Sequence, residues 1–167
     1  MNTATANGIR IRYDVQGQGP WLILCHSLAT DLSLWDDQMP ALTAKFRVLR
    51  FDTRGHGGSD APAGDYDFPM LATDVLGLMD ALGVAKAHFL GISLGGMIGQ
   101  HLVLAAPGRL ERLVLVSTTS GYPPEAAAQW AERNRTVAAG GLEPLVAPTL
   151  ERWFTPAFRE AQPAVMA

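Results

Sequence analysis

Short apolar runs alternate along the chain with longer segments of helical periodicity. The continuous run Trp21 to Cys25 is typical of a strand buried on both faces. Further strands are predicted over Ile9 to Val15, Phe46 to Phe51, Ala87 to Ile92 and Leu113 to Val116. Apolar spacing predicts helices over Leu34 to Lys45, Met70 to Leu82 and Leu94 to Ala106, the first of them capped by Asp31 or Ser33.

The alternation of strands and helices with short connections favours an α/β fold, with a mostly parallel sheet and helices on both faces. The character of the sequence changes after Gly121-Tyr122-Pro123-Pro124. Residues 125–167 are alanine-rich and helical in pattern, and they contain no further strand candidate. We therefore expect residues 1–120 to form a sheet-bearing core and residues 121–167 to form part of a helical cap.

Composition excludes several classes of function. With 48% apolar and 17% charged residues the chain is typical of a folded globular protein. Thirteen Lys and Arg against sixteen Asp and Glu give a net charge of −3, and no basic stripe indicates nucleic acid or a membrane surface as a partner. A single cysteine, Cys25, excludes an internal disulfide and a cysteine-based zinc site, and we expect no metal and no cofactor.

The first eight residues lack the pattern of a signal peptide. No apolar stretch approaches the roughly 18 residues that a membrane-spanning helix requires. A cytoplasmic location is therefore expected.

The segment Gly91-Ile92-Ser93-Leu94-Gly95 lies where a predicted strand meets a predicted helix. A G-x-S-x-G motif in this context is typical of a nucleophile elbow, in which a sharp turn exposes the serine hydroxyl. The flanking glycines allow the strand and helix to approach closely. Ser93 is therefore the candidate nucleophile, and a purely structural strand-to-helix turn is the alternative interpretation.

A serine nucleophile needs donors that stabilise the oxyanion formed during attack. The backbone N–H of Leu94 begins a predicted helix, where N–H groups have no intrahelical acceptor and the helix dipole favours negative charge. The backbone N–H of Leu28, in the loop after the strand Trp21 to Cys25, is the second candidate. That loop could equally be an ordinary strand-to-helix connection.

A serine nucleophile also needs a base, and none of the four histidines is convincing from its position. His26 is nearest, but a structural hydrogen-bonding role in its turn is favoured. The strand after Ser93 ends in Val116-Ser117-Thr118-Thr119, which contains no carboxylate. The simplest interpretation places the acid and the histidine beyond Ala167, and a shortened, non-catalytic protein is the alternative.

Several segments carry a resemblance to a known family. The run His26 to Pro40, the loop Phe51 to Asp60 and the elbow resemble the α/β-hydrolase superfamily. More narrowly, the chain resembles the 3-oxoadipate enol-lactonases of the β-ketoadipate pathway, on the segments Tyr66, Leu71 to Leu76, Trp130 with Arg133 and Val137, and Arg152 to Phe158. The resemblance runs from about Ile9 to Phe158, and a complete enzyme would add about a hundred residues, including the last strands of the sheet.

The resemblance implies a small lactone or ester substrate that Ser93 opens through an acyl-enzyme. Arg133 is then the candidate partner for the substrate carboxylate, because a guanidinium pairs well with a carboxylate, and a solvated surface arginine is the alternative. Trp130 is a second candidate contact, although a role in the core of the cap is favoured. Ser27 stands where the superfamily usually has glycine, and its hydroxyl is a third candidate.

Two other functional interpretations stay open. A general esterase or a cofactor-free perhydrolase of the same superfamily would use the same Ser93. A non-catalytic fragment or binding module would explain the lack of an acid and a base. If the chain is truncated, the strand Leu113 to Val116 would leave an apolar edge exposed, and we expect the isolated chain to be poorly soluble or partly molten and inactive on p-nitrophenyl acetate.

Overall fold

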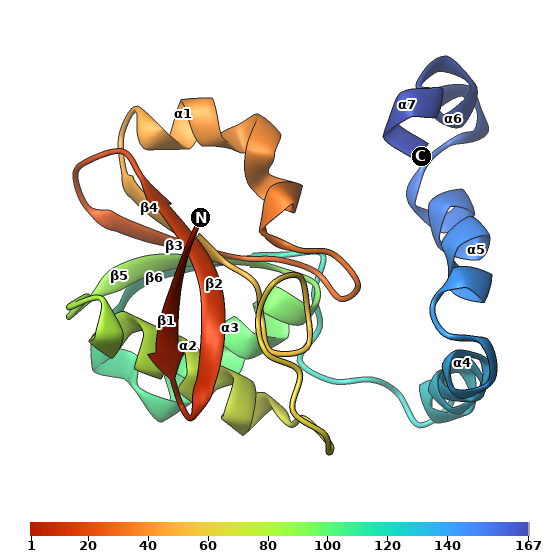
Figure 1. Cartoon of the computed structure of the whole chain (residues 1–167), viewed down its shortest axis with the longest axis horizontal. Helices are drawn as coiled ribbons and strands as arrows, with labels where there is room; N and C mark the ends of the chain where they lie inside the picture. Colours follow the sequence, from red (N-terminus) through yellow and green to blue (C-terminus); the bar gives the residue numbers. More distant parts are fainter. Residues whose placement is uncertain (167) are drawn as a thin grey trace. The chain divides into compact units, whose positions relative to one another are not determined.

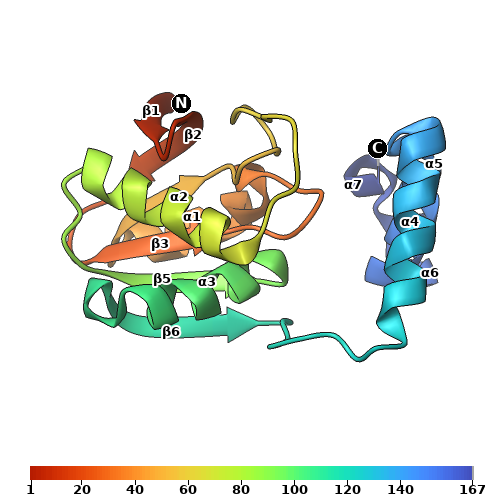
Figure 2. The ribbon, with the colours of Figure 1, turned by 90° about the horizontal axis from the view of Figure 1, so that it is seen from below.

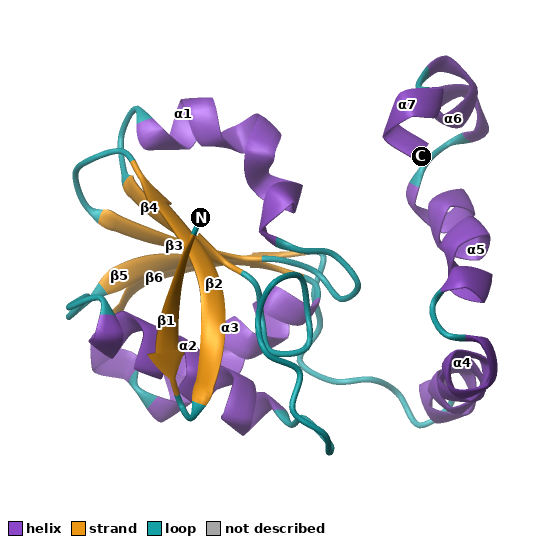
Figure 3. Cartoon of the chain, viewed as in Figure 1, coloured by secondary structure: helices purple, strands orange, loops and turns teal. Residues whose placement is uncertain are grey.

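The computed structural model describes residues 1–166, which form two compact units, one over residues 1–120 and one that begins at Gly121. The first unit holds a six-stranded sheet with helices on its two faces, and the second is helical (Figures 1 and 3). The strands are β1 (Asn2–Ala6), β2 (Ile9–Gln16), β3 (Trp21–Cys25), β4 (Arg47–Phe51), β5 (Ala87–Ile92) and β6 (Leu110–Val116). The first unit's helices are η1 (Leu32–Gln38), α1 (Met39–Thr43), α2 (Phe68–Ala81), α3 (Leu94–Ala105) and η2 (Pro107–Arg109).

The sheet has the strand order β1-β2-β4-β3-β5-β6. Strands β4, β3, β5 and β6 are parallel, as predicted, whereas β2 pairs antiparallel with both β1 and β4. Strand β1 was not predicted. It is joined to β2 by Asn7 and Gly8, both with positive φ, and Asn-Gly is the residue pair that favours this kind of hairpin turn.

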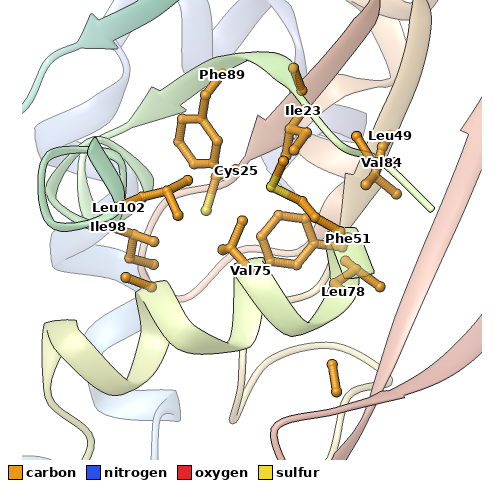
Figure 4. Close-up of a cluster of buried hydrophobic side chains, with 14 of the residues drawn as sticks. Ile23, Cys25, Leu49, Phe51, Val75, Leu78, Val84, Phe89, Ile98 and Leu102 are labelled. Atoms are coloured by element: carbon orange, nitrogen blue, oxygen red, sulfur yellow. The ribbon is translucent and has the colours of Figure 1, made fainter. Parts of the chain in front are cut away.

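The core lies in two layers, one on each face of the sheet. Alternate residues of β3 divide between them, with Ile23 and Cys25 facing α2 and α3, and Leu22 and Leu24 facing η1 and α1. Figure 4 shows the larger layer, where α2 and α3 pack apolar side chains against the sheet. The continuous apolar run in β3 is thus explained by burial on both faces.

The predicted helix over Leu34 to Lys45 is the element that differs most from expectation. It begins earlier, at Leu32, and its first part is a 3₁₀ helix. The Asp31 side chain caps it by accepting the Ser33 N–H. An α-helix starts at Met39 and includes Pro40 in its first turn, the position where proline is tolerated.

Strand β6 forms one edge of the sheet (Figure 2). It begins at Leu110, three residues before the predicted start, and a bulge lies opposite the segment between Ala87 and Phe89 of β5. Three consecutive apolar residues at its end, Val114, Leu115 and Val116, are 46%, 44% and 36% exposed. The apolar edge expected from the sequence is therefore present in this structure.

The second unit consists of α4 (Ala126–Gly140), α5 (Glu143–Trp153), α6 (Pro156–Ala161) and α7 (Pro163–Met166). None of these helices contains a buried residue. Aromatic pairs provide local packing, with Tyr122 edge-on to Trp130 and Phe154 stacked on Phe158. In the part of the chain that the structure describes, every helix is too short or too polar to span a bilayer.

Candidate active site

The connections that follow β3 and β5 run to opposite faces of the sheet. After β3 the chain continues into η1 and α1 on one face, and after β5 it continues into α3 on the other. The two strands are parallel neighbours, with Cys25 opposite Gly91. Loops that leave adjacent strands in opposite directions open a crevice, the usual ligand site of such sheets. The loop with Leu28 and the turn with Ser93 follow these two strands.

Ser93 lies at a sharp turn between β5 and α3, with φ 52° and ψ −113°. Positive φ is uncommon for a residue with a side chain and marks local strain. A Cβ at Gly91 would lie 2.2 Å from the Gly95 carbonyl oxygen, and a Cβ at Gly95 would lie 2.3 Å from the Cys25 carbonyl oxygen. Both motif glycines are therefore required by the close approach of the backbone, and the local geometry is compatible with a nucleophile elbow.

The loop after β3 is tied to the start of α3. The Gly95 N–H donates to the His26 carbonyl at 3.1 Å, so the first turn of the helix lies against the loop that contains Leu28. The following N–H groups, those of Gly96 and Met97, donate to the Ser93 carbonyl at 3.0 and 3.1 Å. Leu94 is the first residue of α3, where a backbone N–H has no acceptor within its own helix. These positions are compatible with an anion site formed by Leu28 and Leu94.

His26 has the structural role that its turn predicts. It is fully buried, its Nδ1 lies 2.7 Å from the Ser27 carbonyl oxygen, and its Nε2 accepts the Thr53 N–H at 3.0 Å. Because both ring nitrogens are occupied, the neutral tautomer with the proton on Nδ1 fits this network. Burial also lowers the pKa of His26. His26 is thus held as a neutral link between two loops and is not placed to act as a base.

The other histidines have partners away from Ser93. His56 accepts the Ala29 N–H at 3.2 Å, His88 lies 3.4 Å from Glu111, and His101 stacks on Phe68. Among residues 1–166 no histidine is hydrogen-bonded to Ser93.

Asp52 connects the loops at the carboxyl end of the sheet. This fully buried carboxylate accepts the N–H of Leu32 at 2.9 Å and the N–H of Gly58 at 2.7 Å, and it lies 2.8 Å from Arg12 Nε. A Cβ at Gly57 would lie 2.1 Å from its Oδ2. The glycine-rich loop after β4 is therefore wrapped around a buried carboxylate, a role that its sequence did not reveal.

The remaining predicted contacts lie in two places. Ser27 is buried in the loop after β3, where its carbonyl accepts the Thr30 hydroxyl at 2.9 Å. Arg133 and Trp130 lie together on α4 of the second unit, and the guanidinium stacks over the indole at 5.5 Å. Within residues 1–166, no three His, Cys, Asp or Glu side chains are grouped as metal ligands.

Sequence reasoning missed Thr118. This residue was noted only because its segment lacks a carboxylate, yet its hydroxyl donates to the Ser93 carbonyl at 2.7 Å. A threonine 25 residues away carries no signal for such a contact, and only the parallel pairing of β5 and β6 could have suggested it.

Known proteins match most of the chain. A family model described as alpha/beta hydrolase fold matches residues 20–163. The 3-oxoadipate enol-lactonase 2 of Acinetobacter baylyi is 40% identical over 167 residues, which are 99% of this chain and 62% of that protein. A carbamate hydrolase homologue, RutD of Stutzerimonas stutzeri, is 34% identical over 137 residues, covering 78% of this chain and 51% of that protein.

A solved structure, the enol-lactonase from Burkholderia xenovorans LB400, is 42% identical with a TM-score of 0.93, and the match covers 99% of this chain and 64% of that one. The chain thus spans less than two thirds of the length of these relatives. The family model covers the four parallel strands β3 to β6, the turn at Ser93 and most of the second unit. The chain therefore belongs to the α/β-hydrolase fold family.

Proposed function

We propose that this chain is the nucleophile-bearing part of a serine hydrolase that opens 3-oxoadipate enol-lactone to 3-oxoadipate in aromatic catabolism. The observation that carries the proposal is the backbone of Ser93, held at positive φ between two glycines that admit no side chain. The choice of substrate is supported by relatives named enol-lactonases at 40% and 42% identity.

The reaction would proceed in two steps. Ser93 Oγ attacks the lactone carbonyl and gives its proton to a base, and the ring C–O bond then breaks to leave an acyl-enzyme that carries the enolate, whose carbon takes the proton from the base to give the ketone. The N–H groups of Leu28 and Leu94 would hold the oxyanion, each contributing about 3 kcal/mol in the transition state. Water then attacks the acyl carbonyl, the Ser93 ester bond breaks, and 3-oxoadipate leaves with Ser93 protonated again.

The base and its acidic partner belong, in this proposal, to residues outside this chain. The histidines of the described region contact residues other than Ser93, and both ring nitrogens of His26 have partners. The 167 residues alone would then bind and orient a substrate carbonyl without efficient turnover.

The second unit would supply contacts to the free carboxylate of the substrate. Arg133 is the proposed cation, since stacking on Trp130 fixes the guanidinium plane while its N–H edge can pair with a carboxylate. Ser27 would add a hydroxyl from the loop after β3.

A chimera tests the proposed activity. This chain would be joined to the part of the Burkholderia xenovorans enol-lactonase that lies beyond the matched region. The relative, which has a similar structure, then supplies the remainder of the fold. The chimera should hydrolyse 3-oxoadipate enol-lactone, and Ser93→Ala should abolish turnover without changing the circular dichroism spectrum. A Ser120→Ala chimera is the matched control and should keep full activity.

The same chimera separates the alternatives. Turnover of p-nitrophenyl acetate or a carbamate that exceeds turnover of the lactone would favour a general esterase or a carbamate hydrolase. Peroxide-dependent halogenation would favour a perhydrolase. A folded chimera with no turnover of any ester would favour the non-catalytic interpretation and overturn the proposal.

A further inference from the structure

The strained turn at Ser93 is held by the end of β6 and by the loop that follows it. The Ser93 N–H donates to the carbonyl of Val116, the last residue of β6, at 2.9 Å, and the Ser93 carbonyl accepts the hydroxyl of Thr118, in the loop, at 2.7 Å. A residue at positive φ persists only where its surroundings hold it there. Val116 and Thr118 each supply one such restraint.

Thr118 also fits the surface of α3 closely. A Cβ at Gly96 would lie 2.7 Å from both Cβ and Cγ2 of Thr118, so glycine at this position makes room for the threonine side chain. The chain turns back toward the helix at Ser117, another residue with positive φ, 43°. Beyond it, Gln100 Nε2 donates to the Thr119 carbonyl at 3.0 Å. Thr118 is thus fixed from both sides.

We propose that Thr118 is a positioning residue that holds the elbow in its strained conformation and so aims the Ser93 hydroxyl and the Leu94 N–H. This role rests on the proposed function of Ser93. The Ser93 carbonyl has two other donors, the N–H groups of Gly96 and Met97, but both belong to α3 and move with it. Thr118 and Val116 are the partners that tie Ser93 to the adjacent strand.

Hydrogen exchange on the 167-residue chain tests the restraint independently of any reaction. In Thr118→Val, which keeps the size of the side chain and loses the hydroxyl, exchange at the amides of Ser93, Gly96 and Met97 should rise about tenfold, as loss of one buried hydrogen bond predicts. Thr118→Ser should restore most of the protection. Thr73→Val, which removes a hydroxyl-to-carbonyl bond of 2.9 Å on α2, is the matched control and should leave these amides unchanged.

Labelling with a fluorophosphonate tests the consequence for the nucleophile. In this reaction Ser93 Oγ forms a bond to phosphorus, fluoride leaves and the serine proton passes to solvent. At alkaline pH the rate for Thr118→Val should fall about tenfold relative to the wild-type chain, with rescue by Thr118→Ser, whereas Thr73→Val should label at the wild-type rate. A general loss of stability would lower the labelling rate in Thr73→Val as well.

The outcomes separate the two proposals. Labelling that persists in Ser93→Ala would contradict the proposed function of Ser93, whatever Thr118 does. Labelling at Ser93 with equal rates in wild type and Thr118→Val would overturn the positioning role alone. If the wild-type chain reacts too slowly to measure, the exchange data decide, and equal protection of the Ser93 amide in wild type and Thr118→Val would refute the proposal.

Discussion

At the scale of single residues, glycine is the most informative residue type in this chain. The elbow motif was predicted because glycine on both sides of a serine matches a steric requirement, and in the structure a Cβ added at Gly91 or Gly95 would lie less than 3 Å from backbone atoms. The residues that hold the elbow from a distance, Thr118 above all, could not be predicted. A hydroxyl that bonds to a carbonyl leaves no pattern in the sequence.

Gly95→Ala tests the steric argument directly. A Cβ at this position meets the backbone of Cys25 and His26, which cannot move as a flexible side chain would. We expect the free energy of unfolding to fall by about 2–3 kcal/mol, measured by urea denaturation. Gly108→Ala is the matched control, because nothing lies within 4 Å of a Cβ there, and it should change stability little. Equal effects of the two substitutions would contradict the close contact.

His26 predicts a pH dependence of stability. Burial lowers the pKa of His26 in the folded chain below its ordinary value of 6.5, so His26 is neutral in both the folded and the unfolded chain well above that pH. As the pH falls through 6.5 the unfolded chain takes up a proton first, and stability decreases until the pH reaches the folded pKa. Urea titrations from pH 7.5 to 5 should show this loss, and His26→Gln should reduce its slope.

An NMR titration of the wild-type chain provides a second measurement for His26. The ring should stay neutral at pH values where an exposed imidazole is already protonated. A titration midpoint at or above 6.5 would be inconsistent with the buried network that joins His26 to Thr53.

Arg133 can be tested in the chimera as a binding residue. Arg133→Ala should raise KM for the carboxylated lactone while leaving the hydrolysis of a neutral ester nearly unchanged, because only the first substrate needs a cation. Arg135→Ala on the same helix, where Arg135 pairs with Glu132, is the matched control. If both substrates were affected equally, the carboxylate assignment would be wrong.

At the scale of elements, periodicity predicted the parallel strands and the helices α2 and α3 with ends within three residues. Periodicity did not predict the elements in which apolar residues are few or irregularly spaced. Strand β1, with the sequence Asn-Thr-Ala-Thr-Ala, has little apolar character, and the Asn7-Gly8 turn was its only marker. Helix α1 is short because Pro40 restricts where an α-helix can begin.

The loops that surround the site depend on Asp52. Asp52→Asn would replace one acceptor oxygen by a donor opposite a backbone N–H, and it would remove the nearer of the two carboxylates that pair with Arg12, leaving Asp31 at 3.6 Å. We expect a loss of about 2–3 kcal/mol in the free energy of unfolding, measured by thermal or urea denaturation. The exposed Asp37→Asn serves as the control, and a comparable loss there would remove the special role assigned to Asp52.

At the scale of the whole chain, the exposed end of β6 predicts self-association. Val114, Leu115 and Val116 present apolar side chains at a sheet edge, a known template for pairing with another chain. The isolated chain should form concentration-dependent oligomers in sedimentation velocity experiments, and Val114→Lys should reduce them. Leu104→Lys is the control, since Leu104 is 80% exposed on α3. A wild-type chain that is monomeric and unfolds cooperatively would contradict this expectation.

The strand order has a consequence for biosynthesis. β5 and β6 add to the same side of the sheet in the order in which a ribosome releases them. The groups that hold the Ser93 turn, from the Cys25 carbonyl to the Thr119 carbonyl, lie within residues 25–119. Because domains form from the N-terminus during translation, a nascent chain can set the geometry of the Ser93 turn before the helical second unit has emerged.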